Sequence, residues 1–212
     1  MGVQDVAEEQ MTERREAVLD AVLALLVEKG EAALTMAAVA QRASCSKETL
    51  YKWFGDRDGL LSATVRWQAS KVRAGSYDRH HFDAGALRES LEAFAGGWLK
   101  VIASETSIAL NRVAIGQAET LGGIVLANGR FAIGERLKPL LVDARDAGLL
   151  AFDDAEETFR TFFGLVGRDA QIRLLLGDRL VLDEAVIAGD ARRATEQFLA
   201  LYGAAKTPGE AG

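Results

Sequence analysis

Cysteine, proline and histidine are scarce in this chain of 212 residues, which contains one, two and two of them respectively. A single cysteine, Cys45, excludes an internal disulfide framework and is typical of proteins from a reducing compartment. No second cysteine and no metal-ligand spacing surrounds it, so we expect Cys45 to be structural and predict neither a metal nor another cofactor. The two histidines, His80 and His81, are adjacent in SYDRHHFDAG, a stretch that we expect to link two helices.

Long apolar runs are also missing. No run approaches the ~20 apolar residues that a membrane-spanning helix needs, and the acidic start, MGVQDVAEEQ, lacks the apolar centre of a signal peptide. We therefore expect a soluble, cytoplasmic protein with no membrane partner. The formal net charge of −6 is unfavourable for nucleic-acid binding unless lysine and arginine gather at one place.

Sustained alternation of apolar and polar residues, which would indicate strands, is absent, and helical periodicity takes its place. Between residues 12 and 29 the apolar residues follow one helical stripe: Val18, Ala21, Val22, Leu25 and Leu26. Thr12 is a suitable N-cap for this helix, and Gly30 a suitable residue for its C-terminal end. Three further helices are expected to begin at N-cap residues: Thr35, Ser46 and Asp56. The predicted fold class is all-α.

A helix-turn-helix is predicted where the second and third of these helices meet across a turn at residues 43–45. In this motif the second helix enters the major groove of DNA with its N-terminal residues toward the base edges. Leu50 and Phe54 would face inward. The outward side then carries lysines, hydroxyl groups and one indole: Ser46, Lys47, Thr49, Tyr51, Lys52 and Trp53. We expect the lysines and Tyr51 to contact phosphates, with Thr49 and Trp53 nearer the base edges.

The stretch LTMAAVAQRASCSKETLYKWFGDRDGLL, residues 34–61, resembles the N-terminal domain of the TetR/AcrR family of transcriptional regulators. The shared pattern is a threonine that opens the second helix, an alanine-rich helix, a small turn, S-K-x-T-L-Y-x-x-F, and a basic residue before a leucine pair. The preceding AVLDAVLALLVEKG resembles the family's first helix, so the resemblance covers about residues 12–65. It adds Thr35 and Arg57 to the candidate DNA-binding residues.

Three residues depart from the family pattern. Ser44 stands in a turn that usually carries a glycine, because one residue there tends to need a positive φ, and the strain would cost about 1 kcal/mol. Cys45 occupies an apolar position, which a buried thiol can fill. Glu48 is also a candidate at the DNA interface, where its carboxylate would either repel phosphate or accept a hydrogen bond from a cytosine amino group.

The remainder of the chain predicts a second helical domain, which also resembles the ligand-binding and dimerisation domain of the same family. We expect a flexible N-terminus at residues 1–11, a DNA-binding domain at 12–65, a ligand-binding and dimerisation domain at 66–203 and a flexible tail at 204–212. In the ligand-binding and dimerisation domain, the first helix is expected at about residues 83–102. The second is expected in TSIALNRVAIGQAET and should be broken at Gly122–Gly123, and the third at about residues 124–147, with Pro139 inside it. A helix from Asp153 or Asp154 to Gly177 and another at about 183–202 complete it.

Polar residues among apolar ones in this domain predict a small-molecule pocket, since an unpaired buried polar group costs ~1–3 kcal/mol. The candidate ligand-binding residues are Trp67, Phe94, Trp98, Asn111, Arg112, Gln117 and Phe131. The last long helices are apolar on two sides, which indicates a second copy of the chain as partner. The candidate interface residues are Phe159, Phe162, Phe163, Val166, Phe198 and Leu201.

These features favour a DNA-binding transcriptional regulator: a homodimeric repressor that a small, mostly apolar ligand releases from a palindromic double-stranded operator. An enzyme is not expected, because no acid–base pair, metal-ligand spacing or phosphate loop can be recognised. A helical dimer that acts through protein partners, without specific DNA binding, stays open as the alternative because of Ser44 and Glu48.

Overall fold

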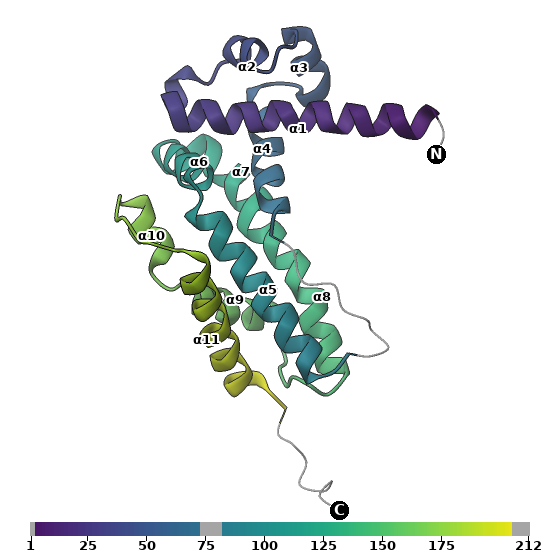
Figure 1. Ribbon diagram of the computed structural model, residues 1–212, viewed down its shortest axis with the longest axis vertical. Coiled ribbons are helices and arrows are strands. Elements are labelled where there is room, and N and C mark those ends of the chain that lie inside the picture. Colours follow the sequence, from purple (N-terminus) through teal and green to yellow (C-terminus); the bar gives the residue numbers. More distant parts are fainter. Residues whose placement is uncertain (1–2, 73–81, 205–212) are drawn as a thin grey trace, which may run out of the picture. The chain divides into compact units, whose positions relative to one another are not determined.

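A computed structural model describes residues 3–72 and 82–204 of the chain (Figure 1). Its elements are helical, and within those residues the β-type pairing is an isolated bridge between Leu150 and Gly203. The all-α prediction is therefore confirmed. Among the same residues, none of the helices is both long and apolar enough to cross a membrane.

The chain divides into two compact units that interleave along the sequence. The first comprises residues 1–71 and 104–132, and the second residues 72–103 and 133–212. The predicted domains were contiguous instead, with a boundary after residue 65. The difference arises because α6 (Glu105–Gly116) packs on α1 (Val3–Lys29), and the segment after α6 packs on α4 (Arg57–Ser70).

In the first unit, α1 buries the predicted stripe that includes Val18, Val22, Leu25 and Leu26. The helix begins at Val3, however, and not at Thr12. Residues 3–11 consist mostly of good helix formers, and the acidic residues among them suit the positive end of a helix dipole, so the helix continues past the last buried turn. Gly30 ends it with φ +70°, as expected.

Three side-chain caps fix the next helices, α2 (Met36–Arg42), α3 (Lys47–Phe54) and α4. Thr35 Oγ1 accepts a hydrogen bond from the backbone N–H of Ala38 at 3.1 Å. Ser46 Oγ accepts from Thr49 N–H at 3.1 Å, and Asp56 Oδ1 from Gly59 N–H at 2.8 Å. All three predicted N-caps are thus confirmed, because short oxygen-bearing side chains satisfy N–H groups that have no partner inside the helix.

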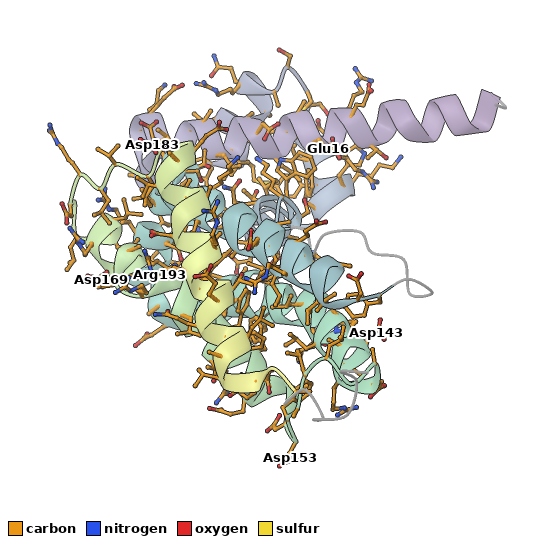
Figure 2. All side chains as sticks on the ribbon, turned by 60° about the horizontal axis from the view of Figure 1, so that its bottom comes forward. Glu16, Asp143, Asp153, Asp169, Asp183 and Arg193 are labelled. Atoms are coloured by element: carbon orange, nitrogen blue, oxygen red, sulfur yellow. The ribbon has the colours of Figure 1, made fainter. Side chains whose placement is uncertain are left out.

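The second unit is built on α5 (Ala84–Ala103), α8 (Ala132–Asp146), α9 (Ala155–Gly167), α10 (Ala170–Leu175) and α11 (Glu184–Tyr202). Side-chain caps again start its helices: Asp83 at α5, Asp154 at α9 and Asp183 at α11, the last visible in Figure 2. The rings of Phe94, Phe162 and Phe198 meet in its core, and all three are fully buried.

Two of the predicted helices are divided differently in the structure. The helix before residue 118 ends at Gln117 (φ −127°, ψ 46°), and Gly122–Gly123 lie inside a helical stretch. That stretch consists of two π-helical turns, Ala118–Gly122 and Leu126–Phe131, on either side of α7 (Gly123–Val125). The single helix predicted from Asp154 to Gly177 is interrupted at Arg168, which has φ 43° and separates α9 from α10. Tertiary packing overrides glycine's low helix propensity in the first case.

Candidate DNA-binding surface

Helix α3 presents one polar face to solvent and packs the opposite face on the first unit. Leu50 is fully buried, and Phe54 is half-buried. Lys47, Tyr51 and Lys52 are exposed, with 52% of the Tyr51 surface accessible. The turn before α3 is closed by backbone hydrogen bonds from Ser44 to Gln41 (3.3 Å) and from Cys45 to Ala40 (3.0 Å). This is the helix-turn-helix arrangement, with α3 in the position of the helix that reads DNA.

Thr49 and Trp53 lie on another side of α3, toward α1. Thr49 is half-buried, and its Oγ1 is 3.1 Å from Ser46 Oγ, so both hydroxyls belong to the start of α3. Trp53 is half-buried with its ring edge-on to Phe54, and the Arg15 guanidinium of α1 lies 5.7 Å from the Trp53 ring centroid. These two side chains therefore do not share the exposed face of Lys47, Tyr51 and Lys52.

Glu48 is fully exposed, and its carboxylate turns back on the start of α3. The backbone N–H of Glu48 itself lowers the pKa of this carboxyl most, followed by the Ser46 hydroxyl, while desolvation opposes the shift and the Lys47 charge adds to it. The negative charge lies in the first turn, where the helix dipole favours it. Glu48 thus has a local structural role in the first turn of α3.

Two basic residues around the motif have partners inside the protein. Arg57 is half-buried, and its Nε donates to the carbonyl oxygen of Leu34 at 3.4 Å, which ties the start of α4 to the residue before Thr35. Arg42, at the end of α2, forms a two-bonded ion pair with Glu28 at 2.6 Å for each bond. This pair lowers the pKa of Glu28 and raises the pKa of Arg42. Within residues 3–72 and 82–204, the ammonium groups of Lys47 and Lys52 form no side-chain hydrogen bond or ion pair.

The turn itself contains the strain expected from the sequence. Ser44 has φ 50°, a left-handed conformation that glycine adopts without a steric penalty. We predict that the stability of the first unit follows the order glycine, serine, valine at residue 44. Ser44→Val should lower the free energy of unfolding by about 1–2 kcal/mol, because a β-branched side chain fits a positive φ poorly. Thermal unfolding followed by circular dichroism measures this, and equal stability of the three variants would contradict the left-handed turn.

Comparison with known proteins agrees with this geometry. Residues 18–64 match the family model for bacterial regulatory proteins of the tetR family, and residues 89–204 match the model for the C-terminal domain of AefR-like transcriptional repressors. The chain is also 47% identical to a TetR transcriptional regulator from Agrobacterium tumefaciens whose crystal structure is known. That alignment covers 90% of this chain and 95% of the other, with a TM-score of 0.77.

The chain belongs to the TetR family of transcriptional regulators. The resemblance seen in residues 34–61 is thereby confirmed. The known proteins and domains that the chain matches are transcriptional regulators and not enzymes. A second similar structure is that of the Flavonoid-responsive Regulator FrrA, which is 25% identical over 91% of this chain and 98% of its own, with a TM-score of 0.66. The transcriptional regulator BetI of Paraburkholderia xenovorans is 46% identical over 66 residues, and this match spans about a third (34%) of the length of BetI.

The ligand-binding residues predicted for this TetR-family chain are divided between the two units. Trp67, Asn111, Arg112, Gln117 and Phe131 lie in the first unit, and Phe94 and Trp98 lie in the second. In the first unit, Trp67 Nε1 donates to Asp20 Oδ1 at 2.9 Å, and Asn111 Nδ2 donates to the backbone oxygen of Ser107 at 2.8 Å. Arg112 and Phe131 are exposed, and Gln117 lines a surface hollow beside Arg57.

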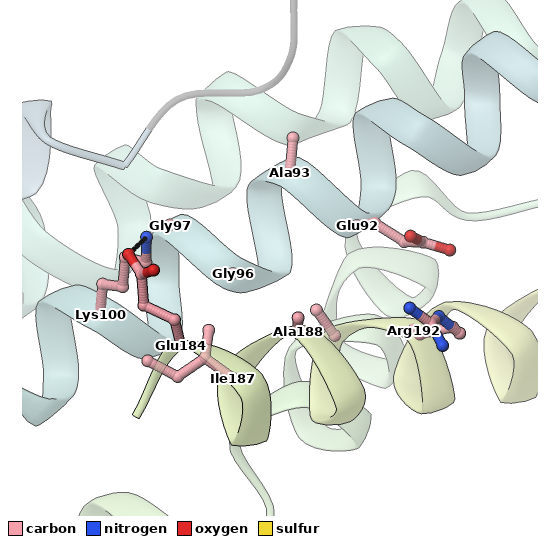
Figure 3. A pocket seen from close by; sticks show the side chains of 10 residues that line it. Glu92, Ala93, Gly96, Gly97, Lys100, Glu184, Ile187, Ala188 and Arg192 are labelled. Atoms are coloured by element: carbon pink, nitrogen blue, oxygen red, sulfur yellow. Dashed lines mark ion pairs between the residues drawn. The ribbon is translucent and has the colours of Figure 1, made fainter. Parts of the chain in front are cut away.

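Phe94 and Trp98 are both core residues of the second unit. The Phe94 ring lies 6.2 Å from Phe162, and the Trp98 ring 3.9 Å from Phe163, between ring centroids. On another face of the same helix, α5 and α11 enclose a groove of about 380 Å³ (Figure 3). Gly96 and Gly97 line it on the α5 side, and an ion pair between Lys100 and Glu184 (3.5 Å) lies at one end. The sequence analysis did not indicate this groove, although the small residues Ala93, Gly96 and Gly97, spaced by three and four positions along α5, could have done so.

The predicted dimer-interface residues are mostly core residues of the TetR-family chain, and this part of the prediction needs correction. Phe159, Phe162, Val166 and Phe198 each have at most 3% of their surface exposed in the single chain, so they have no surface left for a partner to cover. Phe163 is half-buried against Trp98. Of the six, Leu201 is the one with a large exposed surface, 64%.

Proposed function

We propose that this TetR-family regulator is a homodimeric repressor, that it binds a near-palindromic double-stranded DNA operator through α3, and that a small molecule releases it. The observation that carries the DNA-binding part is the exposed face of α3, with Lys47, Tyr51 and Lys52 held outward by the buried Leu50. Two ammonium groups and a phenol suit phosphate oxygens, and the N-terminal turn of α3 is the part that reaches base edges. Thr35 and Ser46 cap α2 and α3 and add hydroxyls at this surface.

Because the chain as a whole is acidic, DNA binding would depend on the positive charge of the exposed face of α3. Because the formal net charge is −6, the protein as a whole is repelled by DNA, and binding depends on the local positive face. Arg42 and Arg57 already bind Glu28 and Leu34, so they add less to that face than their charge suggests. The two lysines of α3 are therefore the main electrostatic contacts that we propose.

Dimerisation is supported by apolar surface that the second unit leaves uncovered. Its exposed large apolar residues are Ile172, Leu176, Val181, Val186 and Leu201, with exposed fractions from 40% to 81%. Ile172 lies in α10, and Leu176 and Val181 lie in the segment that leads to α11, so exposed apolar side chains gather in this part of the unit. A twofold dimer would cover such a surface and would present two α3 helices to the two halves of a palindrome.

The exposed Leu176 provides a test of the dimer. We predict that Leu176→Asp yields a monomer in sedimentation velocity at micromolar concentration, with a melting temperature close to that of the wild type, because 81% of this side chain is already in solvent. Ile115→Asp is the matched control: Ile115 is 63% exposed in the first unit, and this variant should stay dimeric. A dimer of normal strength in Leu176→Asp would exclude the C-terminal end of α10, where Leu176 is the C-cap, from the interface.

The effector that we propose is a mostly apolar or aromatic molecule with one or two polar groups. Asn111, Arg112 and Gln117 interrupt an otherwise apolar stretch of the first unit, and Trp67 lies on α4 of that unit, the helix that follows the DNA-reading helix. The similarity to a flavonoid-responsive regulator supports an aromatic effector that bears hydroxyl groups. A ligand of this kind acts only if it favours the conformation that does not bind DNA.

A gel-shift experiment tests the proposed function directly. Wild-type protein is mixed with a duplex from upstream of its own gene, and protection of the bound duplex is mapped. We expect a retarded complex with a near-palindromic protected site, and its release by a hydroxylated flavonoid but not by the unsubstituted flavone. Failure to retard this duplex more than an unrelated one would favour the alternative of a helical dimer that acts through proteins.

A further inference from the structure

A hollow of about 510 Å³ lies in the first unit between α1, the turn and the start of α3. It is lined by Arg14 from α1, by Ser44 and Cys45 from the turn, and by Ser46, Thr49 and Trp53 at α3. Figure 1 shows α1 running past α3 and continuing beyond it. The hollow is thus bordered by the polar start of the DNA-reading helix on one side and by a cation of α1 on the other.

A second cation, Arg15, stands at the edge of this hollow. Its guanidinium lies 5.7 Å from the centroid of the Trp53 ring, which is the distance of a cation–π contact. Among the acidic side chains that the structure describes, none pairs with Arg14 or Arg15. Both arginines are exposed, and the first buried residue of α1 after them is Val18. Neither side chain is therefore required to hold the core together.

The acidic residues of this part of α1 lie on a different face. Asp20 accepts a hydrogen bond from Trp67 of α4 and lies 4.0 Å from the Lys71 ammonium. Glu13 and Glu16 precede Asp20 by seven and four positions, so the three carboxylates share one face of the helix. Arg14 shares its face with Val18, which also lines the hollow. The face of α1 toward α3 is thus positive although α1 as a whole is not.

We infer that Arg14 and Arg15 extend the DNA interface from α3 onto α1, and that the hollow receives one backbone phosphate of the DNA with its sugar. This inference rests on the proposed DNA-binding function. A guanidinium, hydroxyl groups and the N-terminal turn of α3 are suited to a phosphate, and the Trp53 ring is suited to the apolar side of a deoxyribose. This contact is to the DNA backbone. It therefore increases the affinity and fixes the position of the protein along the duplex, but it does not depend on the base sequence.

Salt titrations of charge-neutral variants test this contact. Arg14→Gln, Arg15→Gln and the double variant are titrated with two 30-base-pair duplexes, one of arbitrary sequence and one from upstream of the gene. Each single variant should reduce the slope of log K against log salt by about 0.9, and the double variant by about 1.8, equally on both duplexes. Arg14→Lys and Arg15→Lys keep the charge and should restore most of the slope. Arg66→Gln, at an exposed arginine of α4, is the control and should leave the slope unchanged.

Lys52→Gln separates failure of this inference from failure of the proposed function. If Lys52→Gln lowers the slope while Arg14→Gln and Arg15→Gln do not, α1 is not part of the interface and the inference is wrong. If none of the three variants changes the slope, the first unit does not bind DNA through α3 at all, and both proposals fail. Melting curves of the variants should match the wild type, because the arginines lie outside the buried turns of α1.

Discussion

Replacing Lys47 and Lys52 together by alanine should lower the affinity for any DNA duplex by about 30-fold at 0.15 M salt. The reason is that a protein that has lost two phosphate contacts releases about two fewer counterions when it binds. Both side chains are exposed on α3, and neither takes part in the core formed by Leu50. The fold should therefore be unchanged, and the melting temperature should stay within about 2 °C of the wild type. Fluorescence anisotropy with a labelled duplex, at salt concentrations from about 0.05 to 0.3 M, measures both the affinity and the slope.

The size of the loss should be the same for specific and arbitrary sequences, since phosphates carry no sequence information. Arg66→Ala, in α4 outside this face, provides the comparison for a simple change in net charge. An affinity loss confined to the upstream duplex would instead assign the lysines to base edges. A double variant with normal affinity and normal salt slope would remove α3 from the interface.

Phe162→Asp should strongly destabilise the second unit. Phe162 is fully buried, with the Phe94 and Phe198 rings at 6.2 and 5.0 Å between centroids. The substitution removes an aromatic side chain and leaves an unpaired carboxylate in its place, at a combined cost of at least about 4 kcal/mol. For a chain of this size, that loss lowers the melting temperature by about 10 °C or more. Circular dichroism and calorimetry measure the shift.

Two control variants test whether the effect of Phe162→Asp comes from placing a charge in the core. Phe162→Leu keeps the site apolar and should cost only about 1–2 kcal/mol. Leu176→Asp introduces the same charge at an exposed position and should melt like the wild type. A Phe162→Asp protein that melts normally but sediments as a monomer would restore Phe162 to the interface predicted from the sequence.

Local rules predicted local structure well in this chain. Thr35, Ser46 and Asp56 cap their helices because the chemistry of a cap involves residues only two or three positions apart. The positive φ of Ser44 was expected for a similar reason, since the turn has a fixed length and geometry. The start of α1 was missed because a change of burial at residues 12–18 does not require the helix to end there.

Predictions that needed tertiary information were less successful. Helical periodicity indicated that Phe159, Phe162 and Val166 face a partner, but it cannot distinguish a partner helix in the same chain from one in a second copy. Arg57 has the charge expected of a phosphate contact, and only the structure places its Nε on the Leu34 carbonyl. Arg14 and Arg15 lie outside the helix-turn-helix motif, so the pattern gave no reason to connect them with α3.

The interleaved course of the chain has a consequence for protein engineering. Hybrid regulators, in which one protein's operator preference is combined with another's inducer response, are most simply made by joining two sequences at a single point. In this protein a junction after residue 65 would separate α1 from α6, which pack together in the first unit. A hybrid that preserves the native packing has to transfer residues 1–71 and 104–132 together, so the operator preference would bring part of the proposed effector-binding region with it.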